Sequence, residues 1–212
     1  MFQIKVLTFN PVQENTYVLY NEHKQCIIID PGCYFEEEKE ELKSFIVRHQ
    51  LQPEMLLNTH CHLDHVFGNK YIADEYKLTL RIHKNEERVL QMAPASALMF
   101  NLPFDNYNGK LIFLKEDDVV SILNDTLKVI DAPGHSPGSV CFYCAQQKFL
   151  IGGDVLFQNS IGRTDLPGGN HDELIRNIRE KLFKLPQDVK VYPGHGPETT
   201  IGDEMELNPY LR

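Results

Sequence analysis

A histidine-rich run of seven residues, Thr59-His60-Cys61-His62-Leu63-Asp64-His65, constrains this chain more than any other feature. It places three imidazoles and one carboxylate within six positions, directly after the apolar Met55-Leu56-Leu57. Burying such a cluster would be costly without a cation to compensate it. Imidazole nitrogens and carboxylate oxygens are ligands that zinc, iron and manganese share, so the run predicts a metal site without choosing the metal.

The spacing within the run indicates two half-sites. If the chain leaves a strand still extended, alternate side chains point to opposite sides, so His60 and His62 share one side and Cys61 takes the other. Asp64 and His65 are adjacent, which suits a chain that turns into a helix and aims this pair at a second point nearby.

Three later positions repeat one pattern, in which a metal-binding residue type follows a predicted strand and a glycine. The tripeptide Pro-Gly-His occurs at 133–135 and again at 193–195, and Gly152-Gly153 precedes an aspartate. Glycine lets the backbone turn sharply and approach a metal without a Cβ clash. The candidate ligands are then His60, His62, Asp64, His65, His135, Asp154 and His195.

Seven ligands are too many for one tetrahedral zinc and suit two metals that share a carboxylate. We expect His60, His62 and His135 on one metal, Asp64, His65 and His195 on the other, and Asp154 as the bridge. Metals about 3.5–4 Å apart can hold a shared water whose pKa falls toward about 7, which supplies hydroxide without a serine or cysteine nucleophile. Zinc is the expected ion, and iron or manganese would be compatible.

The predicted elements run in the order strands, helices, strands and a helix. Strands are expected in the first thirty residues, before His60, and at 78–82, 111–114, 119–123, 127–131, 140–144, 149–152 and 189–192, and helices at 36–49, 66–76, from 85 and from 170. Two facing mixed sheets with helices on the outer faces would bury this pattern. We therefore predict an α+β fold, an αββα sandwich, in a single domain of residues 1–212.

Three smaller expectations concern single segments. Residues 91–109 are too apolar for a solvated linker, so they could cover a pocket, form an interface or pack on the core. Asp30, at a strand end, could bond near the ligand loops or cap a turn, and the turn cap is favoured. Cys141 and Cys144 form a CxxC inside a strand, so we expect two unpaired thiols on opposite faces that bind no metal.

The net charge and the number of cysteines indicate which partners and which cellular compartment to expect. The net charge of −9 disfavours nucleic acid as a partner, since nucleic-acid binding needs a basic surface. The chain holds no apolar run near the ~20 residues that span a bilayer, and its first residues do not resemble a signal peptide. Five cysteines, an odd number, argue against a disulfide framework and for a reducing compartment, so a cytoplasmic protein is expected.

The run 59–65, taken with His135, Asp154 and His195, resembles the HxHxDH pattern of the metallo-β-lactamase superfamily. The resemblance covers nearly the whole chain. It implies an αββα sandwich with two metals at one edge and assigns the ligands as divided above. Flavin-linked diiron members carry Glu at the second His of the pattern, so His62 disfavours that branch.

Within the superfamily the chain looks most like the glyoxalase II group, through Gly162-Arg163-Thr164-Asp165, the segment 192–196 and the tail from Thr199. This resemblance implies a hydrolase of a small-molecule thioester such as S-lactoylglutathione, in which Asp64 and Asp154 serve catalysis. The C-terminal helical domain that holds glutathione in full glyoxalase II is not expected here. Arg163 is expected to bind a substrate carboxylate, or alternatively to pair with Asp165 and brace its loop.

Two other classes of function stay open. Persulfide dioxygenases resemble this chain as well, and they bind one iron through the positions of His60, His135 and Asp154, a set suited to oxygen chemistry. The tail of the chain favours the hydrolase over this oxidoreductase. A metal-free binding or scaffold protein is the third possibility, although no candidate ligand is missing.

Overall fold

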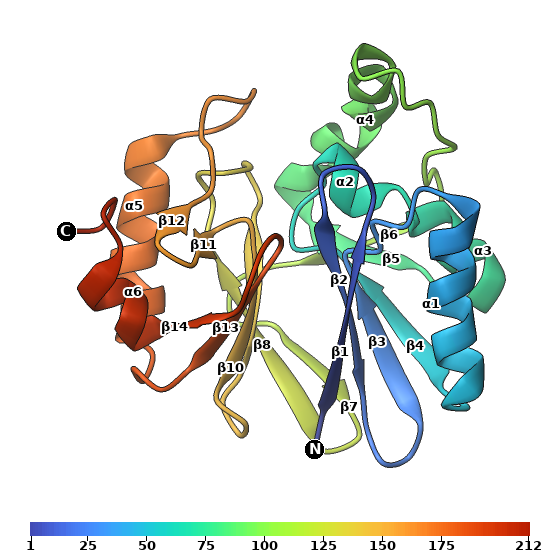
Figure 1. Cartoon of the computed structure of the whole chain (residues 1–212), viewed down its shortest axis with the longest axis horizontal. Coiled ribbons are helices and arrows are strands. Elements are labelled where there is room, and N and C mark those ends of the chain that lie inside the picture. Colours follow the sequence, from blue (N-terminus) through green and yellow to red (C-terminus); the bar gives the residue numbers. More distant parts are fainter.

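The computed structural model describes all 212 residues. Two six-stranded sheets face each other, and helices lie on the outer face of each (Figure 1). Each sheet contains both parallel and antiparallel neighbours, because helical connections alternate with hairpins along the chain. The predicted αββα sandwich is confirmed.

The first sheet is built from the N-terminal half of the chain. Its order is β1 (Gln3–Phe9), β2 (Glu14–Tyr20), β3 (Gln25–Ile29), β4 (Gln52–Leu57), β5 (Leu80–His83) and β6 (Leu111–Leu114). The first three strands pair antiparallel, and the strands from β3 to β6 pair parallel. The parallel pairs place the ends of β3 and β4 at one edge of the sheet.

The second sheet is built from the C-terminal half. Its order is β14 (Thr199–Thr200), β13 (Lys190–Pro193), β10 (Phe149–Gly153), β9 (Val140–Cys144), β8 (Asp125–Asp131) and β7 (Val119–Ile122). The pair β10 and β13 is parallel, so both strands end at the same edge. A short hairpin, β11 (Leu156–Phe157) and β12 (Ser160–Ile161), follows β10 and was not predicted from the sequence.

Apolar side chains form three layers, one between the sheets and one under the helices on each side. Alternation along β9 divides its two cysteines between two of these layers. Cys144 packs between the sheets, and Cys141 packs under the outer helices of the second sheet. All five cysteines are buried and unpaired, as predicted for this CxxC.

Helices α1 (Glu36–Arg48) and α3 (Asn69–Tyr76) cover the first sheet, and α5 (His171–Glu180) and α6 (Ile201–Leu207) cover the second (Figure 1). Asn170 caps α5 through a 3.1 Å bond from Glu173 N to its Oδ1, as expected. Helix α6 was not predicted. No helix of the chain combines the length and the apolar character that crossing a bilayer requires.

The helix expected at 66–76 is divided into α2 (Leu63–Val66) and α3. Gly68 separates them because its N–H donates to Pro31 O at 2.7 Å, outside the helical pattern. A Cβ at this position would lie 2.4 Å from the Cys33 sulfur, so the close approach requires glycine. The earlier start of α2 places Asp64 and His65 on a helix.

After the 3₁₀ turn η1 (Lys84–Glu86), helix α4 (Glu87–Met99) runs well beyond the short helix that was expected. Pro94 lies inside it and cannot donate to the carbonyl of Leu90, four residues earlier. The side chain of Asn106 replaces that missing donor with a 2.7 Å bond to Leu90 O. This bond folds the segment after α4 back onto the helix.

Residues 91–109 therefore pack partly on the core. Ala93 joins the apolar layer of the first sheet, and Phe104 and Tyr107 rest against it. The end of α4 stays in contact with solvent, with Met99 85% and Phe100 69% exposed.

Candidate metal centre

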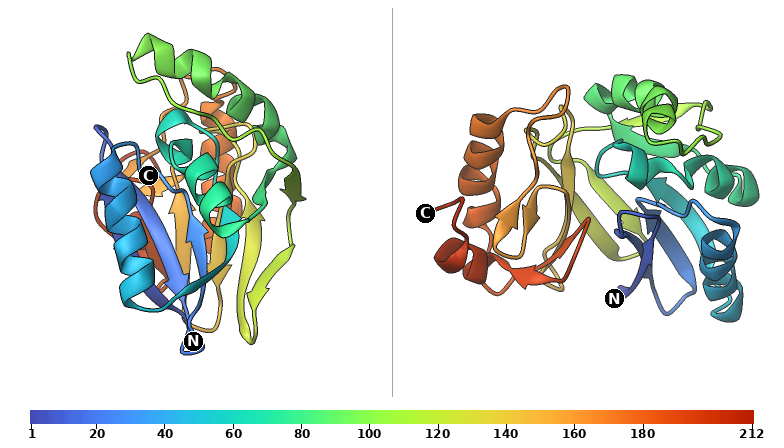
Figure 2. Two further views of the ribbon diagram at one scale, coloured as in Figure 1. Left: turned by 90° about the vertical axis from the view of Figure 1, so that its right-hand side faces the viewer. Right: turned by 45° about the horizontal axis from the view of Figure 1, so that its top comes forward.

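Four strand ends meet at one edge of the sandwich, the upper edge in Figure 1, which comes forward in the right-hand view of Figure 2. Strand β4 leads to His60, β8 to His135, β10 to Asp154 and β13 to His195, while α2 carries Asp64 and His65. All seven residues predicted from the sequence come together at this edge.

Glycines make this approach possible in the way that the Pro-Gly-His pattern predicted. Gly134 adopts a φ of 134°, which side chains rarely tolerate. At Gly194 a Cβ would lie 2.1 Å from Asp154 Oδ1, so only glycine allows the loop of β13 to pass the carboxylate.

The first group consists of His60, His62 and His135. Nε2 of His135 lies 3.2 Å from Nε2 of His60 and 2.8 Å from Nδ1 of His62. His60 and His135 are 1% and 2% exposed. Three nitrogens thus converge on one buried point.

The second group consists of Asp64, His65 and His195. Asp64 Oδ2 lies 3.0 Å from His195 Nε2 and 3.6 Å from His65 Nε2. The side chain of His65 is fully buried, whereas those of Asp64 and His195 are 21% and 27% exposed. This group is therefore the more open of the two.

The carboxylate of Asp154 lies between the groups. Its Oδ1 is 3.4 Å from His65 Nε2, and its Oδ2 is 3.5 Å from His135 Nε2 and 3.6 Å from His195 Nε2. One carboxylate therefore faces ligands of both groups.

Hydrogen bonds behind the rings fix which nitrogen faces inward. Nδ1 of His135 lies 2.7 Å from Arg163 O, and Nδ1 of His195 lies 3.1 Å from Val12 O. A carbonyl can only accept, so each Nδ1 must carry the proton. In the neutral ring, Nε2 then directs a lone pair inward, as a metal ligand requires.

Asp30 does the same for His65 directly and for His60 through Thr59. Its Oδ2 lies 3.1 Å from His65 Nδ1 and accepts a 2.6 Å bond from Thr59 Oγ1, which in turn is 3.2 Å from His60 Nδ1. Its Oδ1 accepts from Asn58 Nδ2 and Thr59 N. The favoured interpretation of Asp30 as a turn cap was wrong, because its carboxylate orients the ligand loop itself.

The donor set fits a cation. The inward nitrogens of His60 and His135 direct lone pairs toward each other at 3.2 Å, close to the spacing of about 3.3 Å between neighbouring donors in a tetrahedral zinc site. His65 Nε2 and Asp154 Oδ1 are buried and have no hydrogen-bond partner. Atoms of this kind are costly to bury unless something charged lies between them.

The two groups differ in their electrostatics. Burial lowers the pKa of His60, His62 and His135, that of His62 to about 4, so these rings are neutral. Burial also disfavours charge on His65 and His195, but Asp154 and Asp64 outweigh it and raise the pKa of both rings. The charge of His65 likewise overcomes burial and lowers the pKa of both carboxyls.

Several residues that hold the site were not found from the sequence. Asn15 Nδ2 donates to Pro193 O at 3.1 Å and to Gly196 O at 2.9 Å, on either side of His195. Tyr17 adds a 2.6 Å bond to Pro193 O. The buried Glu14, 3.8 Å from His65 Nδ1, is another. The one available signal was the polar run Glu14-Asn15-Thr16 in a strand that is otherwise apolar.

The guanidinium of Arg163 forms two parallel bonds with the carboxylate of Asp165, both 2.7 Å. This is the alternative that the sequence left open for Arg163. Both side chains are more than 60% exposed. A solvent-exposed pair of this kind contributes only about 0–1 kcal/mol, so it can open for another carboxylate.

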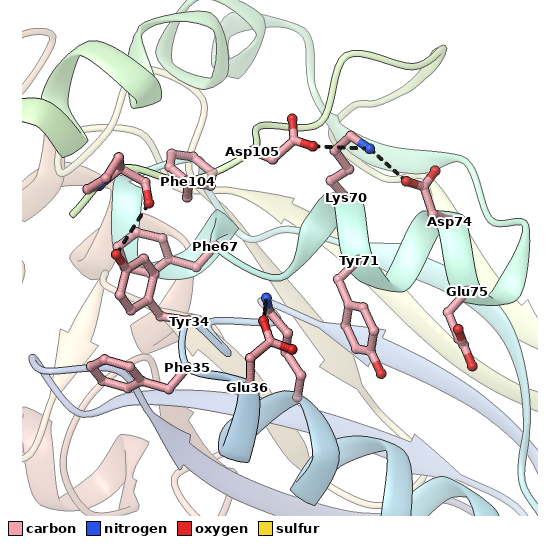
Figure 3. A pocket seen from close by; sticks show the side chains of 12 residues that line it. Tyr34, Phe35, Glu36, Phe67, Lys70, Tyr71, Asp74, Glu75, Phe104 and Asp105 are labelled. Atoms are coloured by element: carbon pink, nitrogen blue, oxygen red, sulfur yellow. Dashed lines mark hydrogen bonds and ion pairs between the residues drawn. The ribbon is translucent and has the colours of Figure 1, made fainter.

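A hollow of about 610 Å³ lies between α1, α3 and residues 103–105 (Figure 3). Tyr34, Phe67 and Phe104 form one wall, and none of the seven candidate ligands lines it. Lys70, on another side, pairs with both Asp74 and Asp105.

Comparison with known proteins gives a consistent result. A family model described as the metallo-beta-lactamase superfamily matches residues 9–195. The probable metallo-hydrolase YqgX of Bacillus subtilis is 36% identical over 208 residues, which cover 95% of this chain and 93% of that protein. The hydroxyacylglutathione hydrolase GloC of Haemophilus influenzae is 34% identical over 210 residues, covering 98% and 97%.

Solved structures agree with these relatives. The crystal structure of the BLEG-1 B3 metallo-beta-lactamase superposes with a TM-score of 0.90 at 39% identity, covering 99% of both chains. That of TTHA1623 in a di-iron-bound form gives a TM-score of 0.87 at 33% identity, covering 98% of this chain and 100% of the other.

Proposed function

The chain belongs to the metallo-β-lactamase superfamily, and we propose that it is a dinuclear metal-dependent hydrolase of thioesters, glutathione thioesters among them. One observation carries the dinuclear part: Asp154 lies between two complete groups of three donors. The thioester part is supported by the similarity to GloC over almost the full length of both chains. The proposed setting is the cytoplasm.

His60, His62 and His135 would hold one ion, Asp64, His65 and His195 the other, and Asp154 would face both. Two divalent ions at such a centre supply a hydroxide nucleophile near neutral pH and polarise the substrate carbonyl. Zinc is the proposed ion. Iron is compatible with the similarity to a protein solved in a di-iron-bound form.

The chain's own residues would serve the reaction in different ways. Asp64, in the more open group, would orient the attacking hydroxide besides holding its ion. The hydrogen bonds behind the rings keep the inward lone pairs in place. A thiol has a pKa of about 8.5, so the thiolate leaves without a general acid.

We further propose that Arg163 binds a carboxylate of the thiol carrier. Its guanidinium would exchange Asp165 for the substrate, since both carboxylates accept the same two parallel bonds. The backbone carbonyl of Arg163 holds His135, so the side chain is anchored next to the centre.

A second candidate is hydrolysis of a β-lactam amide, which the 39% identity to a B3 metallo-beta-lactamase favours. This reaction also begins with attack on a carbonyl, but its nitrogen leaving group needs a proton. A mononuclear persulfide dioxygenase is less well supported, because it would use His60, His135 and Asp154 and leave the second group without a role.

Metal analysis combined with a substrate panel tests the proposal. The panel contains thioesters of glutathione and of other thiols, a β-lactam and glutathione persulfide with oxygen. We expect two metal ions per chain and fastest turnover of a thioester. One iron per chain with oxygen consumption, or turnover of the β-lactam alone, would overturn the thioesterase assignment.

A further inference from the structure

Glu86, the last residue of η1, is a fully buried acid outside the candidate ligand set. Its Oε2 accepts a 2.7 Å bond from Cys61 N, and its Oε1 accepts 2.6 Å bonds from Ser136 Oγ and Gly138 N. Three donors satisfy this carboxylate, and they come from two different loops.

These two loops carry the whole three-histidine group. Cys61 lies between His60 and His62, and Ser136 follows His135. One loop leaves the first sheet and the other leaves the second, so the spacing of the histidines depends on how the loops are joined. A backbone bond from Val140 N to Thr59 O, 2.8 Å long, joins the same segments further back.

We propose that Glu86 is a positioning residue that sets the geometry of the three-histidine group without touching it. This inference rests on the proposed function, since it takes the three histidines to be ligands of one ion. Glu86 fixes the backbone on which two of the histidines stand and ties it to the backbone of the third. None of its three bonds reaches the loop of His195. Asp64 and His65 follow Cys61 on α2, but His65 has its own support from Asp30 and Asn58, so we expect this group to depend less on Glu86.

Glu86→Gln should weaken this tie while keeping the size of the side chain. A carboxylate accepts on both oxygens, whereas an amide offers one oxygen and one NH₂ group. If the amide oxygen keeps Ser136 and Gly138, its NH₂ faces the N–H of Cys61, and two donors cannot bond. In the reverse orientation the NH₂ can still donate to Ser136 Oγ, because a hydroxyl also accepts, but it faces the N–H of Gly138 and that bond is lost. Either way one of the two backbone amides loses its acceptor, and the tie between the loops is weakened.

The test is a titration of the metal-free full chain with Co²⁺ against a competing chelator. Changes in ligand support outside the coordination sphere typically lower metal affinity about 10- to 100-fold. We expect such a loss for one of the two binding steps in Glu86→Gln and little change in the other. His62→Ala and His195→Ala identify the steps, because each should leave one ion in place. Added to His195→Ala, Glu86→Gln should lower the affinity for the remaining ion. Added to His62→Ala, it should not.

Ser136→Ala provides a second variant, milder than Glu86→Gln. It removes one donor to Glu86 and keeps both amide donors, so the same step should weaken by a smaller factor at an unchanged melting temperature. A parallel loss in both steps together with a lower melting temperature would show that Glu86 only supports the fold and would overturn the inference. Unchanged affinities in Glu86→Gln would overturn it as well.

The two proposals can fail separately. A wild-type chain that binds a single ion at the three histidines would contradict the dinuclear centre, and Glu86 would then be judged on that one binding step. A wild-type chain that binds two ions, with no selective loss in Glu86→Gln, would contradict the role of Glu86 alone. A wild-type chain that binds no ion would overturn both.

Discussion

The two halves of the candidate centre are built differently. The three-histidine group contains only neutral nitrogens, is almost closed to solvent at His60 and His135, and is tied together from behind by Glu86. The group of Asp64, His65 and His195 includes a carboxylate and has two partly exposed members.

The hydrogen bonds that hold the second half also differ from those of the first. His195 is held by carbonyls of Val12 and Gln13 at 3.1 and 3.2 Å, in the turn between β1 and β2, and by Asn15 on the loop around it. The first half is therefore the more buried one, whereas two members of the second half are partly exposed to solvent. Ions bound at the two halves should respond differently to the same perturbation.

The largest expected effect comes from Asp154→Ala, because this carboxylate faces both groups. Metal content should fall at both halves and hydrolysis should be lost, whereas His195→Ala should deplete mainly one ion. Metal analysis of the purified variants measures this. Equal depletion in the two variants would remove the bridging assignment and with it the distinction between the halves.

Chelation of the wild-type protein sharpens the comparison. The second ion should leave first, because Asp64 and His195 are reachable from solvent and His60 and His135 are not. Limited treatment with a chelator should then give a form with one ion, which spectroscopy of the Co²⁺ protein would assign to the three-histidine group. Simultaneous release of both ions would argue that burial does not separate them.

Asn15→Ala mirrors Glu86→Gln on the other half. Losing its two bonds to the carbonyls around His195 should weaken the second binding step about 10-fold and leave the first unchanged. Thr8→Val is the matched control, since it removes only the hydroxyl that donates to Asn15 Oδ1. A weaker first step in Asn15→Ala would contradict the independence of the two tethers.

Arg163→Ala should weaken substrate binding and leave the metal content unchanged. Losing a charged hydrogen bond of about 1.5–3 kcal/mol that is equal in ground and transition states raises KM and leaves kcat nearly constant. Steady-state kinetics with a glutathione thioester measures this, and Asp165→Asn serves as the control that frees the guanidinium. A lower kcat with reduced metal content at constant KM would show that the ion pair with Asp165 only braces the loop.

The smallest effect on metal is expected from the CxxC of β9. Cys141→Ser and Cys144→Ser should each leave both ions in place, because the sulfurs lie in apolar layers. Burying a more polar hydroxyl in these apolar layers should lower the free energy of unfolding by about 1–3 kcal/mol. Metal content and urea denaturation report the two quantities. Metal loss from a folded variant would be evidence against this placement.

Much of the centre was predictable because most of its ligands belong to short sequence motifs. His60, His62, Asp64 and His65 lie within six positions, and the glycines before the other ligands mark sharp strand-end turns. The strands themselves follow from apolar runs and turn residues. These signals depend only on neighbours in the chain, so they can be recognised without the fold.

The tethers could not be predicted for the opposite reason. The polar run Glu14-Asn15-Thr16 marks Asn15 as unusual but does not say what it binds. Glu86 and Asn15 bond backbone amides and carbonyls that are 25 to 181 positions away, and a backbone group leaves no mark in the sequence. Helix α4 was underestimated because Pro94 normally ends a helix, and the compensating bond comes from Asn106 beyond its end. In each case the structure depends on a hydrogen-bond partner that is distant in the chain.

The most direct test of the central claim is a crystal structure of the metal-loaded protein with anomalous scattering data collected at the absorption edge of the bound metal. The account predicts two anomalous peaks per chain, about 3.5–4 Å apart as in dinuclear hydrolases, one among His60, His62 and His135 and the other among Asp64, His65 and His195, with Asp154 between them. A single peak bound by His60, His135 and Asp154, with the second group empty, would contradict it.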